Sequence, residues 1–194
     1  MKTVQPHEPS VRFETMSPDT YKNSGEGLTI EYGFDAGPFG KCFIAWTDQG
    51  ICSLWFMDQT SRKEALESFS KDWTHAKLKQ NQNKAKDLIK QIFMSPQSRK
   101  SPIQVICRGT KFQLKVWNAL LKIPPGAVVN YKTVAQWMNA PKSVRAVGNA
   151  IGKNPIAYLI PCHRVIRSTG HLSGYRWGSA RKKRILAAEH GICG

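Results

Sequence analysis

The stretch "YKTVAQWMNAPKSVRAVGNAIGK", Tyr131 to Lys153, decides the fold of the second half of this chain. Its first eight residues have the apolar spacing of a short helix, and the breaker "NAPK" follows them. A second amphipathic helical pattern then begins at Ser143, a candidate N-cap. Two short helices across a tight turn, the second bearing Arg and Asn among small residues, predict a helix-turn-helix. An ordinary helical hairpin in a core is the alternative.

The positive charge of the chain is concentrated in the same half. Residues 96–194 hold 17 Lys and Arg against one acid, Glu189, whereas residues 1–95 hold 12 of each kind. Because self-repulsion of this size destabilises a fold, we expect a polyanionic partner, with nucleic acid as the first choice. A generally basic surface is the alternative, and charge alone does not separate RNA, DNA and a membrane surface.

The next stretch, "NPIAYLIPCHRV" (154–165), sets a cysteine and a histidine side by side. Adjacent side chains of an extended segment point to opposite sides, so contact between Cys162 and His163 must come from the fold. A lone buried cysteine is commonly just a small apolar residue. Arg164 and its basic surroundings would stabilise a thiolate, and Glu189 in the last helical pattern could hold the imidazole. A simple ion pair between Glu189 and a Lys or Arg is the alternative for that carboxylate.

The rest of the chain predicts an α/β region in front of a mostly α-helical one. We expect a loose lead-in at 1–26, an α/β domain at 27–95, a linker and strand at 96–106, and the helical domain at 107–194. The expected elements are a strand at 28–34, a hairpin at 41–58 turning at 48–50, helices at 61–73 and 83–93, a linker at 95–102, a strand at 103–109, a helix at 110–123 and a last helix ending at Glu189.

Several classes of protein are excluded by simple patterns. No window of about 18 apolar residues could span a membrane, and the opening "MKTVQPHEPS" lacks the apolar run of a secretory signal. The five cysteines are scattered, with no CxxC pair or Cys/His cluster, which predicts neither a disulfide framework nor a metal site. These patterns favour the cytoplasm and a protein without metal or cofactor.

Five further motifs identify a family resemblance. "FQLKVWNALLKIPPG", "SVRAVGNAIGKNP", "IPCHRVI", "STGHLSGYRWG" and "LAAEHG" resemble, in order and spacing, the O6-alkylguanine-DNA alkyltransferases, or methylated-DNA–protein-cysteine methyltransferases. The resemblance is strong over 112–191. It extends more weakly through "YKNSGEGLTIEYGF", which is similar to the alkyltransferase half of the bacterial adaptive-response protein. The family implies a ribonuclease-H-like first domain and a helix-turn-helix that enters the minor groove.

The resemblance also implies roles for individual residues. Cys162 would accept the alkyl group, His163 would act as a base through a bridging water, and Glu189 would orient that imidazole. Asn154 would be the hinge that ties the recognition helix to the active-site loop. Tyr131 would crowd the phosphate beside the lesion and donate a proton to the departing guanine.

Other family positions would contact DNA or the extruded base. Arg145 would fill the gap left in the duplex, and the large ring of Trp177 would narrow the base pocket against bulky adducts such as O6-benzylguanine. The DNA-binding set is Arg145, Tyr131, Ser143, Ala146, Asn149 and Lys153, and the pocket set is Tyr175, Trp177, Lys182 and Val165.

The implied activity is direct reversal of DNA alkylation. The methyl on O6 of guanine, and by the same resemblance that on O4 of thymine, would pass irreversibly to Cys162 after base flipping, once per molecule. The partner would be double-stranded DNA containing O6-alkylguanine, bound by a monomer away from membranes. A helix-turn-helix protein that binds alkylated or ordinary DNA without chemistry is the alternative. The alkyltransferase-like proteins of that kind replace the cysteine, which this chain keeps.

Overall fold

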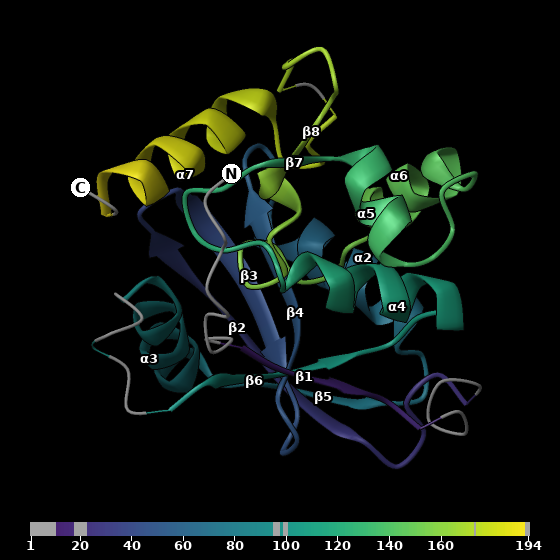
Figure 1. The fold of residues 1–194 in the computed structure, drawn as a ribbon. Coiled ribbons are helices and arrows are strands. Elements are labelled where there is room, and N and C mark those ends of the chain that lie inside the picture. Colours follow the sequence, from purple (N-terminus) through teal and green to yellow (C-terminus); the bar gives the residue numbers. More distant parts are fainter. Residues whose placement is uncertain (1–10, 18–22, 95–97, 99–100, 173, 193–194) are drawn as a thin grey trace.

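A mixed six-stranded sheet forms the base of the fold (Figure 1). The computed structural model describes residues 11–17, 23–94, 98, 101–172 and 174–192. Strands β2, β3 and β4 form an antiparallel meander, while β1 runs parallel to β6 and β5 parallel to β2. The spatial order is β1-β6-β4-β3-β2-β5, with bounds Val11–Thr15, Ile103–Cys107, Ile51–Met57, Gly40–Trp46, Thr29–Gly37 and Lys77–Gln80 respectively.

The predicted hairpin is confirmed, and its alternating pattern gives the sheet two buried faces. The β3–β4 turn closes through Thr47 N–H to Gly50 O at 2.9 Å, where Gly50 has a φ of 148° that disfavours a side chain. Along β3, Ile44 belongs to one core cluster and Phe43 to the other, as period-two alternation requires. Both faces must therefore be covered by other elements.

One helix of the first half covers each face. Helix α2 (Arg62–Asp72) begins at the predicted N-cap Ser61, which forms a capping box with Glu64, and it buries Phe69 in the cluster that contains Phe43. Helix α3 (Gln82–Phe93) buries Ile89 in the opposite cluster. The predicted helices at 61–73 and 83–93 are thus confirmed.

The second half is mostly helical, as predicted. Its elements are α4 (Lys111–Leu120), β7 (Val129–Asn130), α5 (Tyr131–Trp137), α6 (Val144–Gly152), the 3₁₀ turn η2 (Cys162–Arg164), β8 (Val165–Ile166) and α7 (Ser179–Ile192). Helices α4, α5 and α6 group together, and the small β7–β8 pair lies between them and α7 (Figure 1). The buried indole of Trp117 in α4 donates to Ala150 O in α6 at 2.8 Å.

The loop that leads to Cys162 is hydrogen-bonded to the sheet of the first half. Leu54 in β4 donates its N–H to Pro155 O at 3.1 Å and accepts from Ala157 N–H at 2.8 Å, which makes a short parallel bridge. Strand β4 pairs with β6 only through Ile51, so the loop takes the free edge of β4 beyond that point. One hydrophobic cluster consequently runs from the sheet through α3 into the helices of the second half.

Four strands were not predicted from the sequence, and two of them are the two-residue strands β7 and β8. The expected loose lead-in over 1–26 is wrong for Val11–Thr15, which pairs with β6, and no strand was predicted at Lys77–Gln80. Residues 1–10 and 18–22 of the lead-in, and 95–97 and 99–100 of the linker, lie outside the described residues. Within the part of the chain that is described, no helix combines the length and apolar character needed to cross a bilayer.

Candidate active site

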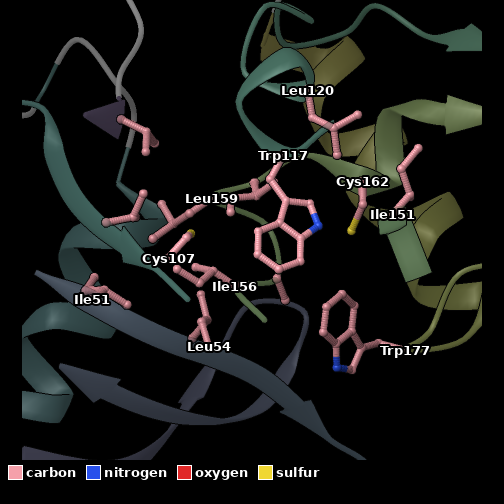
Figure 2. Close-up of a cluster of buried hydrophobic side chains, with 14 of the residues drawn as sticks. Ile51, Leu54, Cys107, Trp117, Leu120, Ile151, Ile156, Leu159, Cys162 and Trp177 are labelled. Carbon is pink, nitrogen blue, oxygen red and sulfur yellow. The ribbon is translucent and has the colours of Figure 1, made fainter. Parts of the chain in front are cut away.

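Cys162 begins η2 at the edge of the large hydrophobic cluster. Its side chain is buried, and the cluster that surrounds it includes Trp117, Leu120 and Ile151 from α4 and α6 (Figure 2). Pro161 precedes it with a φ of −80° and ends the apolar run, as the sequence indicated. A cysteine in such a place would be inert without polar neighbours.

Asn154 supplies the first of these polar neighbours. This fully buried side chain donates from Nδ2 to Cys162 Sγ at 3.1 Å and to Ile160 O at 2.9 Å. Its Oδ1 accepts from Ile156 N–H at 3.0 Å. Asn154 comes directly after the C-cap of α6. It therefore joins that helix to the loop that leads to Cys162, and the same side chain donates the hydrogen bond to the sulfur.

His163 is joined to Glu189 by a buried hydrogen bond. The distance from His163 Nε2 to Glu189 Oε1 is 2.9 Å. Arg164 donates to the same carboxylate from Nε at 3.1 and 3.2 Å and from Nη2 at 2.7 Å. Glu189 therefore makes both the hydrogen bond to the imidazole and the ion pair with an arginine that the sequence analysis left as alternatives.

The protonation of this group follows from its surroundings. Burial raises the pKa of Glu189, but hydrogen bonds from His163 and Arg164 outweigh it and lower that pKa to about 2. Burial also lowers the pKa of His163, which makes the imidazole neutral at pH 7. A neutral ring that donates from Nε2 to Glu189 has an unprotonated Nδ1, and Nδ1 has no hydrogen-bond partner among the described residues. The ring is thus ready to accept a proton.

The surroundings of Cys162 disfavour ionisation of its thiol in the protein without DNA. Burial raises the pKa of Cys162 to about 11, while the Asn154 hydrogen bond and the positive charges of Lys182 and Arg176 act in the opposite direction. Arg164 and its basic surroundings were expected to stabilise a thiolate: Lys182 and Arg176 do favour it, whereas Arg164 is not among the charges that lower this pKa. Its guanidinium is occupied by Glu189 and by Ile123 O.

The four residues expected to line the base pocket are all buried, as Cys162 and His163 are. Lys182 Nζ donates to Val165 O at 2.6 Å, and burial lowers the pKa of Lys182. Tyr175 has its ring edge-on to His163 at 6.5 Å and to Trp177 at 5.4 Å. The hydroxyl of Tyr175 is buried without a hydrogen-bond partner in the described part of the chain, which leaves a donor available inside the site.

Tyr131 lies at the start of α5, half-buried and within electrostatic reach of the sulfur. Burial and the charge of a Cys162 thiolate raise its pKa, so the phenol keeps its proton. Two glycines lie beside it: a Cβ on Gly148 would be in ordinary van der Waals contact with the Tyr131 ring at 3.7 Å, and one on Gly174 with its hydroxyl at 3.6 Å. The protonated phenol therefore lies between α6 and the 174 loop.

Four of the six expected DNA-binding residues lie on the outer face of α6 and at its C-cap. Arg145, Ala146 and Asn149 are exposed, as is Lys153 at the C-cap, while Val147 and Ile151 point into the core. Ser143 is half-buried and occupies the N-cap position, but its side chain makes no capping hydrogen bond. This face is free to meet a flat or grooved partner.

Sequence reasoning missed one contact of the imidazole. Tyr158 stacks on His163 with ring centroids 5.9 Å apart and an interplanar angle of 12°. Tyr158 has a φ of 65°, a conformation that no sequence signal indicated. Among the described residues, no group of three or more His, Cys, Asp or Glu is arranged to hold a metal ion.

Comparison with known proteins agrees with the motifs. The family model described as the 6-O-methylguanine DNA methyltransferase DNA-binding domain matches residues 111–191. The methylated-DNA–protein-cysteine methyltransferase of Mycolicibacterium paratuberculosis is 36% identical over 162 residues, which cover 82% of this chain and 92% of that protein.

Two further relatives extend the likeness to the first half. The bifunctional transcriptional activator/DNA repair enzyme Ada of Escherichia coli is 36% identical over 179 residues, 90% of this chain and 49% of that protein. The chain thus spans about half the length of the first curated relatives it matches. The crystal structure of Mycobacterium tuberculosis OGT in complex with DNA superposes with a TM-score of 0.66 at 34% identity, covering 83% of this chain and 93% of that one.

Proposed function

Because the chain belongs to the methylated-DNA–protein-cysteine methyltransferase family, we propose that it repairs DNA by moving an alkyl group from O6 of guanine onto Cys162. The observation that carries this proposal is the buried set of Cys162, held by Asn154, beside His163, held by Glu189. A binding module without chemistry needs no nucleophile and base in one buried site.

The proposed reaction begins with removal of the thiol proton. His163 takes it at Nδ1 through a bridging water, and the ionised Glu189 stabilises the imidazolium that results. The Asn154 amide and the Lys182 ammonium favour the thiolate once it forms.

The alkyl carbon is then transferred in one displacement. A new S–C bond forms as the C–O6 bond breaks, and the bonding electron pair leaves with the guanine. Tyr131 donates a proton to the ring as that charge develops, and the proton held on His163 then passes through solvent to the Tyr131 phenolate, so that both side chains return to their starting states. The products are S-alkylcysteine and normal guanine. Since a thioether is a poor leaving group, the thiol is not regenerated and each molecule acts once.

The proposed partner is double-stranded DNA that contains O6-alkylguanine. Helices α5 and α6 would act as a helix-turn-helix in the minor groove, with the exposed face of Arg145, Ala146, Asn149 and Lys153 against the backbone. Ser143 and Tyr131 would border this face, and Arg145 would fill the gap left by the flipped nucleotide. Extruding that nucleotide costs a few kcal/mol.

Further parts of the proposal follow the family. Tyr175, Trp177, Lys182 and Val165 would line the base pocket, and O4-methylthymine would be a second substrate. We also propose a ribonuclease-H-like first domain that acts as a scaffold, a DNA-binding and transfer domain at 107–194, a monomer, no cofactor, and the cytoplasm as location. The bonds between β4 and the active-site loop support the scaffold role.

Intact mass measurement tests the proposed function. After incubation with a duplex containing O6-methylguanine, the wild-type chain should gain one methyl group and no more. Cys162→Ser should gain none while still binding the duplex, and Cys42→Ala, which removes a buried cysteine elsewhere, should be methylated like wild type. Binding of the duplex by the wild-type chain without a gain in mass would favour the binding module instead.

A further inference from the structure

Tyr158 has a backbone conformation that bulky residues rarely adopt. Its φ is 65°, in the left-handed region, and it is one of three non-glycine residues with positive φ in the described chain. Strain of this kind persists only where the surroundings impose it, and it gathers at functional sites. All three lie in turns, but Ser24 and Asn139 are small polar residues, whereas Tyr158 carries a bulky ring.

The conformation places the Tyr158 ring against the imidazole of His163. The two rings are nearly parallel, 12° apart, with centroids at 5.9 Å. Tyr175 meets the imidazole edge-on at an interplanar angle of 82°. These rings restrict the plane of His163, whereas its hydrogen bond to Glu189 fixes the direction of Nε2 alone.

Two aromatic residues of the first half of the chain pack against the Tyr158 ring. Phe39, in the β2–β3 turn, lies 5.8 Å from it and Phe93, at the end of α3, lies 4.8 Å away. The ring of Phe93 packs closely against the backbone of Gly37. A Cβ at that position would lie 2.6 Å from the ring, so this contact confines Phe93. The loop backbone is bonded to Leu54 only one residue before Tyr158. The sheet domain therefore packs against the ring of the half-buried Tyr158 and restricts its movement.

We propose that Tyr158 is a positioning residue for His163: the first half of the chain, through Phe39 and Phe93, presses its ring onto the imidazole and aligns Nδ1 for proton transfer from Cys162. This inference rests on the proposed function, since it assigns His163 the role of base. It gives the sheet domain a part in the chemistry beyond holding the loop, because a small misalignment of a proton acceptor slows transfer strongly.

Two substitutions at Tyr158 separate the ring from the backbone. Asparagine tolerates positive φ but has no aromatic ring, whereas phenylalanine keeps the ring. In single-turnover methylation of an O6-methylguanine duplex, Tyr158→Asn should be slower by about tenfold to a hundredfold, and Tyr158→Phe should stay close to wild type. The pH–rate profile of Tyr158→Asn should also shift, because its imidazole is no longer confined.

Controls separate this idea from loss of stability and from failure of the proposed function. Phe69→Leu removes an aromatic ring from the opposite core cluster and should leave the rate and pH profile unchanged. A wild-type rate and profile in Tyr158→Asn would overturn the inference, whereas a wild-type chain that gains no methyl would overturn the proposed function. If Tyr158→Asn does not fold, Phe39→Leu removes one supporting ring, and an unaltered rate and profile in that variant would equally refute the role.

Discussion

Glu189 is the single acid in the last 99 residues, and its surroundings keep it ionised although it is buried. Arg164 meets it with several donors and His163 with one. The adjacency of Cys162, His163 and Arg164 in sequence suggested that all three serve the thiol. Arg164 instead neutralises the carboxylate, because the tight turn of η2 directs successive side chains to different neighbours. A local pattern identifies such residues but not their partners.

Acid should unfold this protein partly through His163 and Glu189. The pKa of Glu189 is lowered from 4.5 to about 2 and that of His163 is lowered from 6.5. A group with a lowered folded pKa contributes stability above its ordinary pKa and loses it as pH falls. The free energy of unfolding should therefore decline below about pH 6.5, first through His163 and below about pH 4.5 through Glu189.

Urea unfolding between pH 3 and 8 measures this decline. Glu189→Gln should be less stable than wild type at pH 7 by an amount on the order of 3 kcal/mol, and the gap should narrow toward pH 3 as the wild-type carboxylate loses its advantage. A gap that stays constant over the whole range would contradict the assignment of the acid-sensitive stability to Glu189.

Trp177 should restrict the size of the adduct that reaches Cys162. Its buried indole packs edge-on against Tyr175 and against Phe56 of β4, so it cannot swing aside without opening the core. O6-benzylguanine should inactivate the wild-type chain slowly, and Trp177→Gly should react faster by about tenfold or more. Intact mass gives the rate of benzylation, and circular dichroism checks that the variant is folded. Rapid titration of the wild-type thiol would contradict this prediction.

At the scale of elements, the strands missed from the sequence are the two edges of the large sheet and the two-residue strands β7 and β8. The inner strands β3 and β4 have apolar residues on both faces, and "DQG" marks the turn between them. The edge strand β5, "KLKQ", has one apolar residue, because it adds to β2 mainly through backbone hydrogen bonds. Lysines on such an edge also discourage pairing with other chains. The edge strand β5 therefore leaves no alternation for sequence analysis to detect, whereas β1, "VRFET", does alternate, with Val11 and Phe13 against the core.

The N-caps of helices α4 and α6 differ in a way that unfolding measurements can detect. Thr110 at α4 forms a full capping box with Gln113, whereas Ser143 at α6, with Ala146 in the corresponding position, makes no side-chain cap, although both are residue types preferred at the N-cap. Thr110→Ala should lower the free energy of unfolding by about 1 kcal/mol, and Ser143→Ala by less than about 0.5 kcal/mol. Equal losses in urea unfolding would show that Ser143 caps its helix in solution.

At the scale of the whole molecule, the two halves depend on one another for the site. The helical half carries Cys162, His163 and Glu189, yet the active-site loop pairs with β4 and shares a core with α3. A linker and strand were expected at 96–106 between the α/β domain and the helical domain, where the charge balance changes. The distribution of charged residues reflects the surface that faces a partner. It carries no information on which apolar side chains of the two halves pack together, so the shared core could not be predicted from it.

Arg181 should be the strongest single polar link between the halves. From the first turn of α7 it donates to Phe39 O at 2.8 Å, pairs with Asp58, bonds Trp177 O and lies 4.7 Å over the Phe56 ring. The ion pair itself adds little, because Asp58 is exposed, but the two buried carbonyls lose their donor in Arg181→Ala. The free energy of unfolding should fall by about 2 kcal/mol or more.

Arg184→Ala is the matched control for this link. Arg184 is exposed on the same helix and makes one bond across the halves, to Pro38 O at 2.8 Å, so its loss should cost less than about 1 kcal/mol. Because Arg181 also holds the Trp177 carbonyl, its removal should raise the rate of benzylation of Cys162, whereas Arg184→Ala should leave that rate alone. Equal stabilities and equal benzylation rates in the two variants would mean that apolar packing alone joins the halves.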